Sequence, residues 1–140
     1  LEYDFDKKLL FTNTSSYAPK EINKNAYGLH FFNPICHLKI IETTCAESIF
    51  EKRFNYLFLK LKELNFKLIF VKNNRGYIYN YILFNKIASY YELIEKYGYN
   101  KSEIEEVLNF FDEKNNFDEV TDLVGAELTK NIIKNLFNKN

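Results

Sequence analysis

Two apolar runs separated by Asn33-Pro34 constrain the fold of this chain more than any other feature. The first run covers residues 27–32 and contains His30, and the second covers residues 38–43 and contains Glu42. Proline lacks an amide hydrogen and disfavours helix at the residue before it, so a bend is expected between the runs. A fully extended chain would separate His30 from Glu42 by roughly 40 Å. We therefore predict two strands folded back on each other, with the imidazole and the carboxylate in a direct pair.

A histidine paired with a carboxylate is typical of an oriented general base, because the carboxylate accepts from one ring nitrogen and stabilises the imidazolium. The simpler alternative stays open at this point. A histidine on an apolar strand is more often a hydrogen-bonded core or surface residue, and a glutamate at a strand end is often a solvated carboxylate.

The composition is that of a globular protein, and the net charge does not indicate a particular class of binding partner. Of the 140 residues, 46% are hydrophobic and 27% are charged, and 19 basic residues balance 19 acidic ones. No basic stripe alternates with aromatic residues, so neither nucleic acid nor an anionic membrane surface is expected as a partner. No apolar run reaches the roughly 18 residues of a transmembrane helix.

The two cysteines, Cys36 and Cys45, are expected to be reduced thiols in a cytoplasmic protein, since no secretory signal is seen ahead of them. We expect no metal site. Cys36 and His37 are adjacent and would point to opposite faces of a strand, and no further spaced ligand completes a tetrahedral set.

The hydrophobic spacing changes from strand-like to helical near residues 72–74. A helix is expected over residues 44–64, opened by a capping box of Thr44 and Glu47, and a strand over residues 66–71. Beyond Gly76, apolar residues recur every three or four positions. This spacing predicts helices over residues 77–97, 102–113, 117–124 and 126–137. The fold class is therefore α/β followed by all-α, with a domain boundary between residues 72 and 73.

Three segments resemble the L-3-hydroxyacyl-CoA dehydrogenases, a family that includes the 3-hydroxybutyryl-CoA dehydrogenases. Residues 28–42, GLHFFNPICHLKIIE, are similar to the family signature G-[LM]-H-F-F-N-P-V-P-x-M-K-L-V-E. Residues 12–16, TNTSS, match its T-N-T-S-S motif, and residues 74–80, NRGYIYN, resemble its D-x-P-G-F-[IV]-x-N motif. The resemblance covers nearly the whole chain, strongly at these motifs and thinly between them.

The resemblance implies the last strands of a Rossmann-type NAD-binding domain in residues 1–72. A helical C-terminal domain like that of 6-phosphogluconate dehydrogenase would follow in residues 73–140. The implied activity is NAD-dependent oxidation of L-3-hydroxyacyl-CoA to 3-oxoacyl-CoA, or the reverse reduction, in fatty-acid or butyrate metabolism. The implied partners are an acyl-CoA substrate and a second copy of the chain, bound through the helical domain.

The resemblance also implies roles for individual residues. His30 would take the proton of the 3-hydroxyl group while Glu42 orients it, Ser15 would hydrogen-bond the substrate oxygen, and Asn80 would contact the reacting region. Ser16 is the alternative to Ser15, and either serine could simply close a turn. The implied catalytic residues are His30, Glu42, Ser15 and Asn80. The residues expected to face the cofactor are Asn13, Ser15 and Asn33.

The chain contains no G-x-G-x-x-G motif, which in the resembled family holds the cofactor. We therefore expect a fragment that is inactive alone. One alternative is a non-catalytic remnant that acts as a dimerisation or interaction module. Another is an L-gulonate-type hydroxyacid dehydrogenase, a related group with H-P-V-N-P in place of residues 30–34, which Phe31-Phe32 disfavours.

Overall fold

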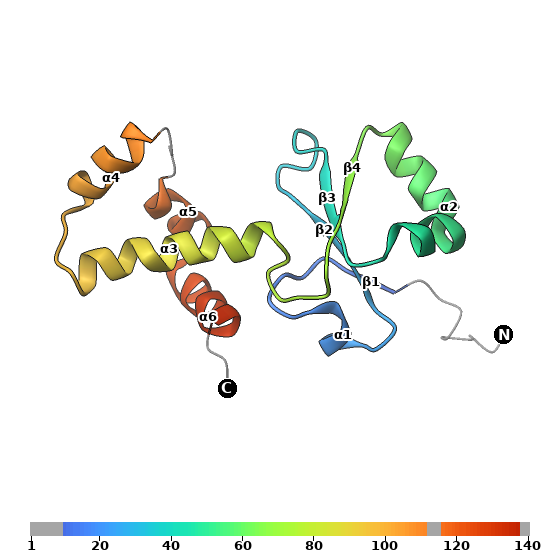
Figure 1. Ribbon diagram of the computed structural model, residues 1–140, viewed down its shortest axis with the longest axis horizontal. Helices are drawn as coiled ribbons and strands as arrows, with labels where there is room; N and C mark the ends of the chain where they lie inside the picture. Colours follow the sequence, from blue (N-terminus) through green and yellow to red (C-terminus); the bar gives the residue numbers. More distant parts are fainter. Residues whose placement is uncertain (1–9, 112–115, 138–140) are drawn as a thin grey trace. The chain divides into compact units, whose positions relative to one another are not determined.

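The structure, a computed structural model, describes residues 10–111 and 116–137 and divides into two compact units. The first unit ends at Ile78 and the second begins at Tyr79. Within the described residues, every strand lies in the first unit, and the second unit is built of helices (Figure 1). The expected fold class, α/β followed by all-α, is confirmed. The division into functional domains at residues 72 and 73 stays a prediction.

The first unit is organised around a mixed sheet with the strand order β1-β2-β3-β4. β1 (Phe11–Thr12) pairs in parallel with β2 (Tyr27–Phe31). The predicted reversal after Pro34 is confirmed, because β2 pairs antiparallel with β3 (Ile40–Thr43). β4 (Lys67–Phe70) then returns parallel to β3.

Helix α2 (Glu47–Glu63) provides most of the core that packs on the sheet. Its buried face carries four residues at spacings of three and four, which is the pattern of an amphipathic helix: Phe50, Phe54, Phe58 and Leu61. Phe50 is fully buried and its ring contacts those of Phe11, Phe54, Phe58 and Phe70. Leu29 and Ile41 enter the same core from β2 and β3.

The predicted capping box at the start of α2 is wrong. The N-cap residue is Ala46, and its side chain makes no capping hydrogen bond. The hydroxyl of Thr44 instead accepts a hydrogen bond of 2.8 Å from the Gly28 amide. The threonine therefore ties the end of β3 to β2, a tertiary contact that outweighs the local capping pattern.

A short helix, α1 (Pro19–Ile22), lies between β1 and β2. Glu21 in this helix forms hydrogen bonds of 2.8 to 3.1 Å with the guanidinium group of Arg75. This interaction lowers the pKa of Glu21, chiefly through the hydrogen bonds from Arg75. The ion pair connects α1 to the segment that follows β4.

The second unit consists of α3 (Tyr79–Glu95), α4 (Lys101–Phe110), α5 (Phe117–Val124) and α6 (Ala126–Phe137). The end of the helix expected over residues 102–113 falls partly outside the described residues. Asn116 is the N-cap of α5, because its side chain accepts from the Glu119 amide at 3.1 Å. Gly125, with a φ of 93°, ends this helix in the left-handed region that glycine tolerates best.

The core of the second unit corrects one expectation from the sequence. The helical spacing of one set of apolar residues predicts a stripe that faces Ile82, Ile87 and the C-terminal helix: Ile104, Val107, Leu108 and Phe111. Ile104 is buried and Leu108 packs against the core, but Val107 and Phe111 are 57% and 70% exposed. Helix α4 therefore packs against the core through Ile104 and Leu108, whereas Val107 and Phe111 remain largely exposed. No helix among the described residues combines the length and apolar character needed to cross a membrane.

Candidate active site

The predicted pair of His30 and Glu42 is confirmed as a direct contact. Nδ1 of His30 lies 2.9 Å from Oε2 of Glu42. The two residues are register partners on β2 and β3, and opposite residues of an antiparallel pair project to the same face of the sheet. Both are buried, at 7% and 3% exposure. A carboxylate and an imidazole buried in contact form the strongest candidate for a chemical site in the chain.

The contact selects one tautomer of His30. A glutamate carboxylate only accepts hydrogen bonds, so the Nδ1 facing it carries the proton. Nε2 then holds the lone pair and can accept a proton from another molecule. When Nε2 is protonated, the imidazolium that forms is stabilised by the adjacent carboxylate. The geometry is that of a general base and its orienting partner.

The second carboxylate oxygen of Glu42 is also held. Its Oε1 accepts a hydrogen bond of 3.0 Å from the amide of Ile78. The ring of Tyr77 stacks on the imidazole of His30, with 4.7 Å between centroids and 2° between planes. Reasoning from the sequence assigned no role to Tyr77 or Ile78, although both lie inside the NRGYIYN motif. The motif was the available signal, but the contacts depend on a backbone turn that spacing does not reveal.

Strand β2 is anchored on both sides of His30. The hydroxyl of Thr43 donates to the carbonyl of Gly28 at 2.8 Å. On the other side of His30, the amide of Phe31 donates to the side-chain oxygen of Asn13 at 2.9 Å. The edge of the Phe32 ring approaches His30, with 4.9 Å between centroids. These contacts fix the strand position from which the imidazole projects.

The other residues expected at the site occupy different places. Asn13 follows β1, at the edge of the sheet where β2 also ends. Ser15 is half-buried, and its carbonyl accepts a 2.7 Å hydrogen bond from Gly76, the residue before Tyr77. The Ser16 amide donates to Thr14, as in a serine-threonine turn.

Two further expected residues lie in other elements. Asn33 is exposed in the loop between β2 and β3. Asn80 is half-buried in the first turn of α3, within the second unit. The structure therefore brings His30 and Glu42 together. The roles of Ser15, Asn80, Asn13 and Asn33 stay predictions.

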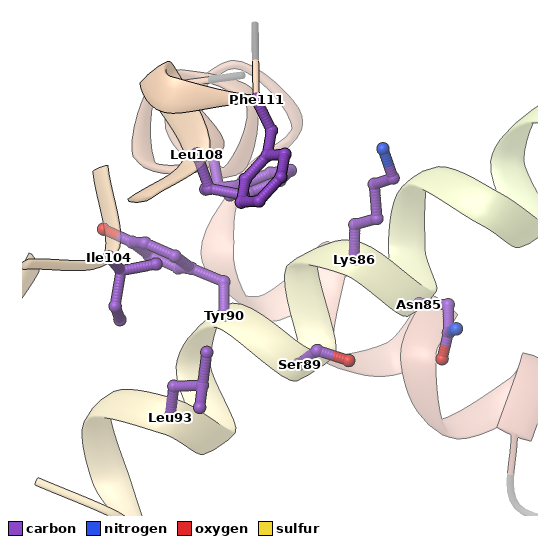
Figure 2. A pocket seen from close by; sticks show the side chains of 9 residues that line it. Asn85, Lys86, Ser89, Tyr90, Leu93, Ile104, Leu108 and Phe111 are labelled. Carbon is purple, nitrogen blue, oxygen red and sulfur yellow. The ribbon is translucent and has the colours of Figure 1, made fainter. Parts of the chain in front are cut away.

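The second unit contains an apolar pocket of about 340 Å³ between α3 and α4. Figure 2 shows Tyr90 and Leu93 of α3 on one side and Ile104, Leu108 and Phe111 on the other. Lys86 and Asn85 lie on the α3 side as polar lining residues. The pocket can admit an apolar group, but its residues include no histidine or carboxylate, so it is not a candidate for the proton chemistry.

Neither a metal nor a complete dinucleotide has an evident site among the residues that the structure describes. The described residues contain no group of three His, Cys, Asp or Glu side chains that could hold a metal ion. The four glycines are widely separated, so the chain has no glycine-rich loop to bind a pyrophosphate at a helix N-terminus. Asn13 and His30 do lie at the carboxyl ends of parallel strands, where α/β sheets bind ligands.

Comparisons with known proteins agree with the motifs. The sequence is 28% identical over 106 residues to a 3-hydroxybutyryl-CoA dehydrogenase of Clostridioides difficile, which covers 71% of this chain and 38% of that protein. No protein-family model matches. The chain thus spans well under half the length of this curated relative.

Two solved structures share the fold. The (S)-3-hydroxybutyryl-CoA dehydrogenase PaaH1 of Ralstonia eutropha matches with a TM-score of 0.77 and 20% identity. FadB2 of M. tuberculosis matches with a TM-score of 0.75 and 21% identity. Each match covers 92% of this chain and 48% of the solved chain. The chain is therefore similar in sequence to a 3-hydroxybutyryl-CoA dehydrogenase, and it has the fold of the matched part of these two solved structures.

Proposed function

We propose that this chain supplies the catalytic base of an NAD-dependent L-3-hydroxyacyl-CoA dehydrogenase. The observation that carries the proposal is the buried 2.9 Å contact between Nδ1 of His30 and Oε2 of Glu42. It occurs inside the sequence segment most similar to the family signature. The name of the curated relative supports the same reaction class.

In the proposed reaction, Nε2 of His30 accepts the proton of the substrate 3-hydroxyl group. The hydrogen on the same carbon leaves with its electron pair, and the carbon–oxygen bond becomes a carbonyl. Glu42 stabilises the imidazolium that forms, and the reverse reduction uses this imidazolium as the acid. A bound nicotinamide provides the acceptor for the hydride.

The remaining proposed roles belong to polar residues near the ends of the strands and the start of α3. Ser15 would donate to the substrate oxygen, and Asn80 would contact the reacting region. Asn13, Ser15 and Asn33 would face the cofactor. The diphosphate of the cofactor needs a glycine-rich loop, which this chain does not contain.

We also propose that the protein forms a homodimer through its helical unit. Phe110 and Leu123 are 85% and 89% exposed, so the helical unit offers large apolar side chains that a second copy could cover. Sedimentation at several concentrations tests this, with Phe110→Ser and Leu123→Ser expected to shift the equilibrium toward monomer. A monomer at all concentrations would contradict the proposal.

The decisive test of activity uses the complete product of the gene, assayed by NADH formation from (S)-3-hydroxybutyryl-CoA and longer-chain homologues. We expect turnover that His30→Ala abolishes. His37→Ala is the matched control, because His37 is exposed in the loop between β2 and β3.

The outcomes separate the candidate functions. No turnover with any acyl-CoA, combined with intact self-association, would favour the interaction module instead. Turnover of L-gulonate in preference to acyl-CoA would favour the related sugar-acid dehydrogenases. Equal activity of the His30→Ala protein and the wild type would remove His30 from the mechanism.

A further inference from the structure

The short segment between β4 and α3 contains an unusual backbone conformation. Gly76 and Tyr77 both have positive φ, at 75° and 51°. Glycine tolerates this left-handed region, but a bulky residue such as tyrosine rarely occupies it. Residues held in such conformations are strained, and they persist where the surrounding structure enforces them, often at functional sites. The contacts of this segment show what enforces it here.

Two backbone hydrogen bonds anchor the segment on either side of Tyr77. The amide of Gly76 donates to the carbonyl of Ser15 at 2.7 Å. The amide of Ile78 donates to Oε1 of Glu42 at 3.0 Å. The left-handed turn therefore delivers an N–H group to the carboxylate and places the Tyr77 side chain between the two anchors.

The Tyr77 ring lies flat against the imidazole of His30, at 4.7 Å and 2°. The phenol oxygen is 3.5 Å from the carbonyl of Thr12, which it faces as a donor. Burial, with a smaller effect of the Glu42 charge, raises the pKa of Tyr77 to about 12, so the phenol is neutral at physiological pH. A neutral aromatic face against the imidazole restricts its rotation and favours the imidazolium electrostatically.

Gly28 makes the space for this ring. A Cβ atom at Gly28 would lie 2.5 Å from the phenol oxygen and 2.6 Å from a ring carbon of Tyr77. Gly28 and His30 are two residues apart on β2, so they face the same side of the sheet. The ring of Tyr77 thus lies over both positions, and the glycine is needed because the tyrosine is there.

We infer that Tyr77 and the amide of Ile78 are positioning elements for the His30–Glu42 pair. The ring fixes the plane of the imidazole, and the amide fixes the second oxygen of the carboxylate, so that Nδ1 stays protonated and Nε2 is presented in one direction. The chemical role rests on the proposed function, whereas the geometric role does not. Tyr77 acts through His30 and has no assigned contact with substrate.

The competing explanation is that Tyr77 only fills space. The matched variants Tyr77→Phe and Tyr77→Leu distinguish the two, because phenylalanine keeps the stacked ring and leucine keeps a buried apolar side chain without it. Both retain a Cβ atom, so both keep the same backbone strain. The complete gene product is labelled with ¹⁵N-histidine, and the signals of His30 are assigned by their loss in His30→Ala.

If Tyr77 positions the imidazole, Tyr77→Phe keeps the wild-type tautomer and ring-current shifts of His30, and Tyr77→Leu changes both. In the activity assay, Tyr77→Leu should lower kcat by about 10- to 100-fold with a much smaller change in KM, since a slightly misplaced catalytic group loses rate on this scale. Tyr77→Phe should stay close to wild type. Unchanged His30 signals and unchanged kcat in Tyr77→Leu, with only a lower melting temperature, would overturn the inference.

Gly28→Ala provides a second route if Tyr77→Leu does not fold. The added methyl group collides with the ring, so the displaced Tyr77 should produce the same change in the His30 signals, and unchanged signals would overturn the inference. The two proposals also fail separately. Suppose that the protein shows no dehydrogenase turnover, but that its His30 signals change in Tyr77→Leu and not in Tyr77→Phe. This result would refute the proposed function and support the positioning role.

Discussion

Replacement of Glu42 by glutamine tests the proposed chemistry most directly, because it keeps the size of the side chain and removes its charge. The structure predicts how the amide would orient. Oε1 of Glu42 accepts from the Ile78 amide, so the single carbonyl oxygen of glutamine should take that place. The NH₂ group would then face Nδ1 of His30 at the position now held by Oε2. Nδ1 would become the acceptor, and Nε2 would carry the ring proton. Nε2 could then no longer accept a proton from the substrate.

Two effects add to the barrier. Unit charges about 4 Å apart in a partly screened site interact with about 4 kcal/mol, and the imidazolium would lose most of this stabilisation. Return to the productive tautomer would also leave two donors facing each other, at a cost of about 1 to 3 kcal/mol. Because these effects overlap, we expect a total of about 3 to 4 kcal/mol, which lowers kcat by roughly 10² to 10³-fold.

The measurement is steady-state kinetics of the complete gene product with (S)-3-hydroxybutyryl-CoA at saturating NAD. The carboxylate acts on a charge that forms as the proton moves, so kcat should fall far more than KM rises. Glu63→Gln is the control, since Glu63 is an exposed residue of α2 paired with Lys60. An effect confined to KM, or a loss in kcat under about tenfold, would refute this account of the pair.

Three further predictions follow from features outside the pair. Thr129→Val should raise the free energy of unfolding by about 1 kcal/mol, because the buried Thr129 hydroxyl has no hydrogen-bond partner among the described residues; urea denaturation measures this. Asp118→Asn should destabilise the protein near neutral pH by up to about 1 kcal/mol, since hydrogen bonds from Lys101 and then Tyr91 lower the pKa of Asp118. A carboxyl group whose pKa is lowered by folding stabilises the protein at pH values above its pKa in the unfolded chain, and this stabilisation is lost as the pH falls. The free energies of unfolding of the two proteins should therefore converge in acid, and a difference that stays constant with pH would contradict the assignment. Finally, the 140 residues alone should neither bind NADH tightly in calorimetry nor oxidise 3-hydroxybutyryl-CoA, because oriented binding contributes about 7 to 11 kcal/mol; low-micromolar NADH binding would contradict this.

The sequence was sufficient to predict the central pair because its geometry depends on local rules. A bend at Pro34 and the two-residue alternation of strands determine that His30 and Glu42 can meet on one face. The helices of the second unit were predictable for a similar reason, since α5 and α6 have clear apolar spacing and α5 has an asparagine cap at its start.

The contacts that were not predicted join segments distant in the sequence. Thr44 has the residue type and spacing of a helix cap, but the nearby Gly28 amide takes its hydroxyl. Tyr77 reaches His30 only through a left-handed backbone, and apolar periodicity carries no information about such a turn. Phe111 follows the helical stripe of α4 yet is exposed, because the pattern does not show which part of a stripe meets a neighbour.

The anchoring of residues 75–78 limits how the loop after β4 can change in length. Arg75 is tied to Glu21, Gly76 to Ser15 and Ile78 to Glu42, so three of the four residues in this stretch are held by three different parts of the first unit. Deletion or insertion of a single residue here would shift every later partner by about 3 Å or more. Loops usually tolerate such changes, but this one sets the alignment of an imidazole. Protein engineers who graft new loops onto this scaffold should therefore leave the connection from β4 to α3 at its present length.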